Sequence, residues 1–341
     1  MGVDLGALAE SRTLQWSELG GKVVAVDAYN TLYQFLSSIR GADGSLLTDT
    51  QGRVTSHLTG LFYRSVKWLE AGIKPVFVFD GKPPDLKRKT LAERRERKEV
   101  AEEARSSAVS EGRLEDARMY AQATSKLTPQ MAEQAKQLLA AMGIPCVQAP
   151  SEGEAQAAEL ARKGMAWASA SQDYDSLLFG CPRLVRNLST SGRRKLPRRS
   201  EYVEIEPQLF ELDSILSHAS LSREQLVWLA MLVGTDYNDG VMGVGPKTGL
   251  KLVGGAKSFK EIVSAIPDKT GLEHWEEIEQ FFLHPPLAEL QPFSFRHPDK
   301  PAVVALLCGQ FDFSSERVGR TMDGLISQQK EAGAQTKLGE W

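Results

Sequence analysis

The sequence predicts an α/β fold in which helices flank a central, mostly parallel sheet. Short runs rich in β-branched, aromatic and small apolar residues occur at 23–27, 75–80 and 166–175, and long stretches with the apolar spacing of amphipathic helices separate them. Each run also ends at aspartate. Because the carboxyl ends of parallel strands share one edge of a sheet, where ligands gather, these acids are expected to meet there.

The predicted elements alternate along the chain. A helix over 29–40 and a second over 57–72 separate the first two strands, which gives a β-α-β unit. A helix at 128–142 leads into a short strand at 144–147, and an apolar helix over 222–233 has Ser222 as its N-cap. Further strand segments are expected at 184–185 and 202–205.

Composition places the chain among soluble globular proteins. Of its 341 residues, 42% are apolar and 25% are charged, and the formal net charge is −3. Three cysteines without CxxC spacing argue against a disulfide framework or a zinc site. The sequence has no secretion signal and no apolar run long enough to span a membrane, so an intracellular protein is expected.

Seven acids could converge at the predicted sheet edge. Two like charges 4 Å apart repel by about 4 kcal/mol at an effective dielectric constant near 20, so such a cluster needs protons or cations. Oxygen ligands without histidine or cysteine suit Mg²⁺ or Mn²⁺, and two such ions would supply four positive charges. An alternative for Glu154 is a role in helix stability alone, as partner of Ser151 in a capping box. The acids are Asp27, Asp80, Glu152, Glu154, Asp173, Asp175 and Asp236.

The segment from Gly81 to about Lys126 is rich in charged residues and poor in large apolar ones. Its basic residues Lys87, Arg94, Lys98 and Arg105 recur at intervals that place them on one side of a helix. The alternative is a solvated helix stabilised by pairs of Glu with Lys or Arg. The position directly after Asp80 favours a basic face turned toward the acids.

Two further segments could contact phosphate. The sequence Gly-Val-Gly-Pro-Lys at 243–247 forms a tight turn that opens a helix, so it offers backbone N–H groups and a helix amino terminus; the alternative is a simple turn between helices. The basic residues at 193–199 are interpreted as a loop that either contacts phosphate or is merely exposed.

Five motifs resemble the flap endonuclease 1 family of structure-specific 5′ nucleases, its archaeal members more than its eukaryotic ones. These motifs are Phe-Asp-Gly-Lys-Pro-Pro at 79–84, Ala-Pro-Ser-Glu-Gly-Glu-Ala at 149–155, Gln-Asp-Tyr-Asp at 172–175, Gly-Thr-Asp-Tyr at 234–237 and the turn at 243–247. The resemblance runs from the amino terminus to at least residue 330. It implies one nuclease domain over 1–328, with a helical arch at about 82–128 and a helix–turn–helix element for duplex DNA at about 222–255.

The resemblance also implies a reaction. The family hydrolyses a phosphodiester where a 5′ flap leaves duplex DNA, using two Mg²⁺ ions, or Mn²⁺, that activate a water and stabilise the in-line displacement. The seven acids named above match the family's metal-binding acids, and Lys87 and Arg94 match its catalytic basic pair. Tyr33 is expected to stack on a base, with core packing as the alternative. Gly2 matches an amino-terminal residue that approaches the site.

Further contacts and partners follow from the same resemblance. The turn at 243–247 would bind duplex DNA and a K⁺ ion. The chain is expected to act as a monomer on branched DNA. Its expected roles are in replication, including Okazaki fragment maturation, and in repair. It would reside in the cytoplasm or nucleoid, since no nuclear-import signal is present. The expected DNA contacts are Arg40, Arg64, Lys98, Gly243, Gly245 and Lys247.

The last residues resemble a motif that binds the sliding clamp, proliferating cell nuclear antigen. Gln335, Leu338 and Trp341 supply its glutamine, its aliphatic residue and its first aromatic residue, whereas the second aromatic residue is absent. The stretch 329–341 is polar and contains Ala and Gly, so a flexible tail is expected.

Three other functions compete with flap cleavage. A sibling nuclease, either a 5′ to 3′ exonuclease or a bubble-cutting repair nuclease, would use the same acids with a different arch, and exonuclease activity is also expected here as a side activity. A catalytically inert scaffold for DNA junctions would have lost at least one acid. A PIN-type ribonuclease would share the acidic sheet edge but not the arch or the glycine turn.

Overall fold

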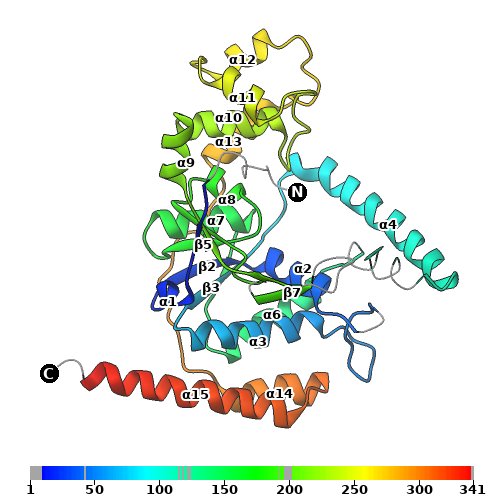
Figure 1. The fold of residues 1–341 in the computed structure, drawn as a ribbon, viewed down its shortest axis with the longest axis vertical. Coiled ribbons are helices and arrows are strands. Elements are labelled where there is room, and N and C mark those ends of the chain that lie inside the picture. Colours follow the sequence, from blue (N-terminus) through cyan, green and yellow to red (C-terminus); the bar gives the residue numbers. More distant parts are fainter. Residues whose placement is uncertain are drawn as a thin grey trace.

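The computed structural model of the chain describes residues 10–41, 44–113, 116, 119–120, 124–190, 192–195 and 202–338 (Figure 1). Gly2 and Trp341, two of the residues expected to act in catalysis and clamp binding, lie outside the described residues. The side chains of Gln335 and Leu338 lie outside them as well.

A seven-stranded sheet forms the centre of the molecule, with the order β1-β9-β6-β5-β2-β3-β4. The five strands from β6 to β4 are parallel to one another, and β9 and β1 extend the sheet antiparallel beyond β6. The predicted α/β fold with a mostly parallel sheet is therefore confirmed. The strands are β1 (Arg12–Thr13), β2 (Val23–Asp27), β3 (Lys74–Phe79), β4 (Cys146–Gln148), β5 (Ala168–Ala170), β6 (Arg183–Arg186) and β9 (Gln208–Glu211).

Helices cover both faces of this sheet because its central strands are apolar on both sides. On β2, Val24 and Val26 belong to the core formed with one helix layer, whereas Ala25 packs in a smaller core with the other. The first layer consists of α2 (Ala28–Ser38), α3 (Ser56–Glu70) and α6 (Pro129–Ala141). On its outer side, α14 (Lys300–Phe311) packs against α6 and α15 (Ser315–Leu338) against α3, as Figure 1 shows. The second layer contains α7 (Gly153–Arg162) and α8 (Asp175–Leu178).

A group of helices beyond α8 forms the upper part of the molecule in Figure 1. Its own core contains Phe179, Phe282, Trp228 and Phe259, all buried. None of the helices that the structure describes has the length and apolar character needed to cross a membrane. The helices of this group are α9 (Leu212–Ala219), α10 (Arg223–Val233), α11 (Pro246–Val253), α12 (Phe259–Ala265) and α13 (Trp275–Leu283); α1 (Trp16–Leu19) precedes β2 at the start of the described chain.

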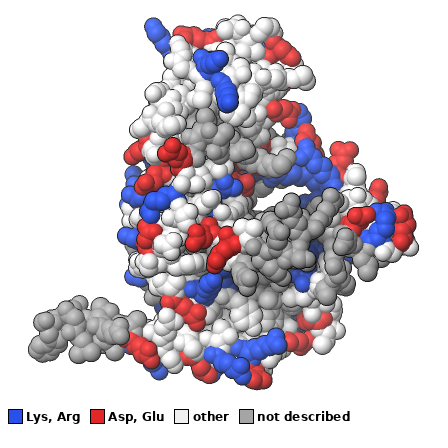
Figure 2. Space-filling model, viewed as in Figure 1, with Lys and Arg blue, Asp and Glu red and all other residues white. Residues whose placement is uncertain are grey.

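One long helix stands away from the body. After β3 the chain forms a short 3-10 helix, η1 (Asp85–Lys87), and continues directly into α4 (Arg88–Ser110), which leans outward in Figure 1. Figure 2 shows an opening between α4 and the body, bordered by Lys and Arg side chains. The segment expected as an arch thus begins with a single projecting helix and returns to the body at Thr128, the N-cap of α6.

Three segments differ from the prediction. The apolar run at 166–175 contributes only the short strand β5, because the chain turns after Ser171 and enters α8 at Asp175. The backbone of 193–195 is not a loop but part of β7 (Gly192–Lys195), which pairs antiparallel with β8 (Tyr202–Ile205). Residues 329–338, expected in a flexible tail, continue α15, since strong helix formers such as Gln329, Lys330 and Glu331 extend it.

His57 makes the stability of this fold depend on pH. Its side chain is fully buried at the start of α3, where Nε2 lies 3.0 Å from Gln134 Oε1 and Nδ1 has no partner among the described residues. Burial lowers the pKa of His57 from 6.5 to about 4. Between these two values the unfolded chain binds a proton that the folded chain does not, so stability is full above pH 6.5 and falls as the pH falls.

We expect this histidine to remove about 2 kcal/mol of folding free energy between pH 7.5 and pH 5. Urea unfolding of the wild type and of His57→Gln at both pH values measures the effect as a difference between the two proteins, which excludes the contribution of other titrating groups. His218→Gln changes an exposed histidine and serves as the control. Equal pH dependence in the wild type and His57→Gln would contradict the assignment.

Candidate metal centre

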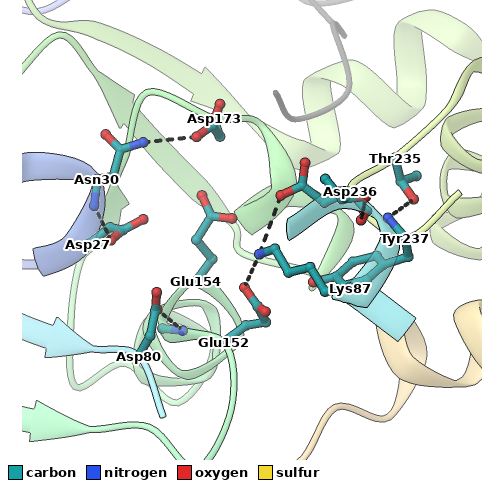
Figure 3. Close-up of polar contacts among 12 residues, drawn as sticks. Asp27, Asn30, Asp80, Lys87, Glu152, Glu154, Asp173, Thr235, Asp236 and Tyr237 are labelled. Atoms are coloured by element: carbon teal, nitrogen blue, oxygen red, sulfur yellow. Dashed lines mark hydrogen bonds and ion pairs between the residues drawn. The ribbon is translucent and has the colours of Figure 1, made fainter. Parts of the chain in front are cut away.

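The predicted acids lie at the carboxyl edge of the parallel strands. Asp27 is the last residue of β2, Asp80 follows β3, and Asp173 follows β5 at the turn that leads to Asp175, the first residue of α8. Glu152 and Glu154 stand at the start of α7, and Asp236 lies in the loop after α10. Figure 3 shows Asp27, Asp80, Glu152, Glu154 and Asp173 around one space, with Lys87 reaching in from the side of Asp236.

The start of α7 is held by the carboxylate of Asp80, which follows strand β3. The N-cap of this helix is Glu152, not Ser151, and the Glu152 side chain accepts no hydrogen bond from the backbone of the first helical turn. Instead the backbone N–H of Gly153 donates to Asp80 Oδ1 at 2.7 Å. A Cβ atom at Gly153 would lie 2.6 Å from the same oxygen, so this close approach requires glycine. The predicted capping box is therefore wrong, and Glu154 is free to face the acidic cluster.

Two neutral side chains connect acids that come from different elements. Asn30, in the first turn of α2, donates from Nδ2 to Asp173 Oδ2 at 2.9 Å, while its backbone N–H donates to Asp27 Oδ1 at 2.9 Å. The Ser171 hydroxyl donates to Glu154 Oε1 at 2.8 Å and lies 3.4 Å from Asp27 Oδ2. These donors hold carboxylates in place without neutralising their charge.

Two cations from the base of the projecting helix contact two further acids, Glu152 and Asp236. Lys87 Nζ donates to Glu152 Oε2 at 2.8 Å and lies 3.3 Å from Asp236 Oδ2, and the Lys87 side chain is largely buried. Arg94 Nη2 donates to Asp236 Oδ1 at 2.5 Å. The basic face predicted for this segment is thus turned toward the acids, and the interpretation as a merely solvated helix does not apply to these two residues.

The electrostatics divide the acids into two groups. Burial, followed by repulsion from Asp80, raises the pKa of Asp27 well above its ordinary value, and burial followed by Asp175 does the same to the pKa of Glu154. Burial and Glu152 raise the pKa of Asp80 to about 6. Burial opposes ionisation of Asp236 too, yet Lys87 and Arg94 lower its pKa. One group therefore carries poorly compensated negative charge, and the other is paired with cations.

The residues of this edge suit a hard divalent cation. Their donor atoms are carboxylate oxygens, and the raised pKa values of Asp27, Asp80 and Glu154 indicate charge that a cation would stabilise. No three Asp, Glu, His or Cys side chains in the described part of the chain already stand in a metal-coordinating arrangement. Mutual repulsion keeps such groups apart, and Lys87 engages two of them, so bound cations would have to draw the acids together.

The residues expected around the flap lie where α4 approaches α2. Lys98 Nζ lies 4.9 Å from the centre of the Tyr33 ring. Tyr33 is 38% exposed, which excludes core packing as its main role. Arg40 donates to the carbonyl oxygens of Ser37 and Gly44 and from Nη2 to Ser125 Oγ at 2.7 Å, so this arginine ties the return of the arch segment to α2.

The expected duplex contacts come from the segment that joins α10 to α11 and from α3. Gly243, Gly245 and Lys247 are exposed in the turn between α10 and α11, with Gly245 as the N-cap of α11 and Gly243 at a φ of 79°. Figure 1 places these helices at the opposite end of the molecule from α15. Arg64 is half-buried on α3, and burial lowers its pKa.

Sequence reasoning missed the neutral residues of the centre. Asn30 and Ser171 were not among the predicted site residues, although both are polar residues close to predicted ligands: Asn30 stands three positions after Asp27 and Ser171 two before Asp173. Thr90 was also missed, and its hydroxyl donates to the backbone carbonyl of Asp236 at 2.6 Å. A polar side chain within three residues of a strand-ending acid is the signal that could have found the first two.

Comparisons with known proteins agree with this geometry. A profile of the XPG N-terminal domain matches residues 4–101, and a profile of the XPG I-region matches residues 143–236. A protein of Staphylothermus marinus named flap endonuclease 1 is 48% identical over 344 aligned positions, which cover 99% of this chain and 98% of that protein.

Two solved structures extend the similarity to three dimensions. The structure of flap endonuclease-1 from Methanococcus jannaschii shares 40% identity with a TM-score of 0.75, covering 97% of this chain and 100% of that one. The catalytic core of Rad2 in complex with a DNA substrate shares 25% identity with a TM-score of 0.71, covering 96% of this chain and 100% of that one.

Proposed function

The chain belongs to the flap endonuclease 1 family of XPG-type, metal-dependent nucleases, and on this basis we propose that it hydrolyses one phosphodiester at the base of 5′ DNA flaps. A 5′ to 3′ exonuclease activity would accompany this reaction. Its product would carry a 5′ phosphate and leave a 3′ hydroxyl, as replication, Okazaki fragment maturation and repair require.

One observation favours this function over the alternatives. Acids from four separate segments face one space at the sheet edge. Lys87, from η1, reaches Glu152 of this group at 2.8 Å, and Arg94, from the adjoining α4, reaches the neighbouring Asp236 at 2.5 Å. A phosphodiester that enters this space would meet carboxylates on one side and cations on the other. An inert DNA scaffold has no need for buried, uncompensated acids such as Asp27, because they cost folding free energy.

The two cations would act on the phosphate. In the resting protein they are paired with Glu152 and Asp236. A phosphate with its developing negative charge offers a stronger partner, and the planar guanidinium of Arg94 can bind two of its oxygens. Stabilising charge that appears in the transition state is usually the largest single contribution to catalysis, so these two residues are proposed as the catalytic pair.

The acids would hold two Mg²⁺ ions, or Mn²⁺, which supply a nucleophilic water and charge stabilisation for in-line displacement. Glu154 and Asp80 face the centre of the space, with Asp173 and Asp175 on the adjoining turn. These four are the proposed direct or nearly direct ligands. Asp27, Glu152 and Asp236 are proposed to act through water, and two of them, Glu152 and Asp236, are already paired with Lys87 and Arg94.

DNA recognition would follow shape and phosphates rather than sequence. The exposed turn at 243–247 offers the backbone N–H groups of a helix amino terminus to one duplex and is the proposed site of a K⁺ ion. Tyr33 exposes its ring beside Lys98 and would stack on a base near the junction. The cation of Lys98 would contact the backbone of the flap, and Arg64 would contact the second duplex.

The carboxyl-terminal residues Gln335, Leu338 and Trp341 are proposed to bind the sliding clamp, with the chain acting as a monomer in the cytoplasm or nucleoid. Residues up to Leu338 continue helix α15, whose outer end points away from the body in Figure 1. A motif at this end would be accessible to a clamp without obstructing the metal centre.

Cleavage of branched DNA tests the proposal. A 5′-labelled flap duplex, a bubble, a blunt duplex and a single strand are incubated with Mg²⁺, and the products are sized at single-nucleotide resolution. One dominant product at the flap junction, lost with EDTA, is the expected result. Stepwise short products from every substrate would show that the protein is mainly an exonuclease, bubble cleavage would favour the repair sibling, and tight binding without cleavage would favour the scaffold.

A further inference from the structure

We propose that Asn30 and Ser171, which lie between the acids of the metal centre, are positioning residues that set the metal affinity of this nuclease. Neither belongs to the acids or to the catalytic pair. Their role rests on the proposed function, because they would arrange its metal-binding carboxylates before any metal arrives.

The two side chains connect acids that the chain brings from distant places. Asn30 Nδ2 donates to Asp173 Oδ2 at 2.9 Å, and Asn30 Oδ1 accepts the backbone N–H of Gln172 at 3.3 Å. A single amide thus fixes both the backbone and the carboxylate of the turn after β5 against α2. Figure 3 shows Asn30 between Asp27 and Asp173.

Ser171 likewise connects this turn to an acid from another element, in this case Glu154 of α7. Its hydroxyl has one proton, which goes to Glu154 Oε1 at 2.8 Å rather than to the more distant Asp27 Oδ2 at 3.4 Å. The same oxygen accepts the backbone N–H of Asp173 at 3.2 Å. Ser171 is 5% exposed, so water cannot easily replace it. The turn and the first helical turn of α7 are therefore held together through one hydroxyl.

The neutral character of these donors is what the metal centre needs. Lys87 and Arg94 hold Glu152 and Asp236 by neutralising them, and a divalent cation would have to compete with those charges. Asn30 and Ser171 hold Asp173 and Glu154 with neutral dipoles, so they place no positive charge beside these acids that would compete with a metal. Outer residues that orient ligands typically contribute about 10-fold to 100-fold to metal affinity.

A purely structural role for Asn30 can be separated from the proposed one. The cap of α2 uses the backbone N–H of Asn30 and the carboxylate of Asp27, and it does not involve the Asn30 side chain. Asn30→Leu therefore removes the amide contacts to the turn while the helix cap stays. Gln34→Leu, one turn further along α2, removes a comparable amide contact to Ser189 that touches no acid.

Mn²⁺ binding to the full chain, measured by electron paramagnetic resonance without DNA, is the test. We expect Asn30→Leu and Ser171→Ala to bind Mn²⁺ about 10-fold to 100-fold more weakly than the wild type. Gln34→Leu and Ser171→Thr, which keeps the hydroxyl, should bind as the wild type does. In flap cleavage the weakened variants should lose kcat at low Mn²⁺, regain it at high Mn²⁺ and keep their KM for DNA.

Two results would overturn the inference alone: wild-type Mn²⁺ affinity in both Asn30→Leu and Ser171→Ala, or an equal loss in Gln34→Leu. Failure of the wild type to bind any Mn²⁺ would instead defeat the proposed metal centre and the inference with it. Thermal unfolding in EDTA identifies a variant that has not folded, and the serine pair then decides the question without the Asn30 variant.

Discussion

Asp175→Asn is expected to lower the rate of flap cleavage by about 10³-fold or more, which corresponds to about 4 kcal/mol of transition-state stabilisation. Asp175 opens α8 beside Glu154 and is 6% exposed, so asparagine preserves the shape of a buried position while removing one ligand charge. Single-turnover cleavage of a labelled 5′ flap in Mg²⁺ measures the loss. The product that remains should still arise at the junction, because the DNA contacts are unchanged.

The same substitution should not destabilise the fold. Asp175 is, after burial, the main cause of the raised pKa of Glu154, so without metal the two acids repel each other. Removing one of the charges should leave the melting temperature in EDTA equal to that of the wild type or higher. A large loss of stability in EDTA would mean that Asp175 has a structural role, and near-normal cleavage would contradict its assignment as a ligand.

Lys87→Ala is expected to lower kcat by about 10²-fold to 10³-fold, the usual effect of removing one donor that stabilises a developing charge. In the absence of DNA the change should not weaken Mn²⁺ binding, because Lys87 competes with cations for Glu152 and Asp236. Affinity equal to or higher than that of the wild type is the expected result. The opposite movement of kcat and metal affinity distinguishes a catalytic cation from a residue that holds the metal centre together.

Lys89 offers a matched control two residues along the chain. It forms an ion pair with Asp239, and its side chain is 70% exposed, so it lies outside the acidic space. Lys89→Ala should retain most of the wild-type kcat. If both alanine variants lost the same activity, the effect would come from the base of α4 as a whole and not from the charge of Lys87.

Local pattern predicted the central part of the fold well. The run 23–27 is β2 with the same bounds, since four apolar residues, three of them valine, between Lys22 and Asp27 favour a buried strand. The helix after Ser222 begins where Ser222 was predicted as its N-cap, and Gln225 completes a capping box there. The acidic edge could be predicted from the positions of the aspartates at the ends of the strands. Parallel strands place their carboxyl ends, and with them Asp27, Asp80 and Asp173, at the same edge of the sheet.

Features that depend on distant partners could not be predicted. The residues that continue the sheet through β9 and β1 pair antiparallel, and nothing local in Arg12 or Thr13 specifies their partner. The Ser151 capping box was a valid local pattern, yet Asp80, more than seventy positions away, supplies the acceptor for Gly153. The role of Asn30 likewise depends on a distant residue, because its side chain binds Asp173 only after α2 has packed beside the turn that follows β5.

Crystals of the protein soaked in Mn²⁺ would locate the ions directly by anomalous diffraction. Two anomalous peaks about 4 Å apart, between Glu154, Asp80, Asp173 and Asp175, are the expected result. Displacement of Lys87 from Glu152 should accompany them. A single peak, peaks outside the acidic edge, or no peak at a Mn²⁺ concentration that supports cleavage would contradict the assignment of this edge as a two-metal nuclease centre.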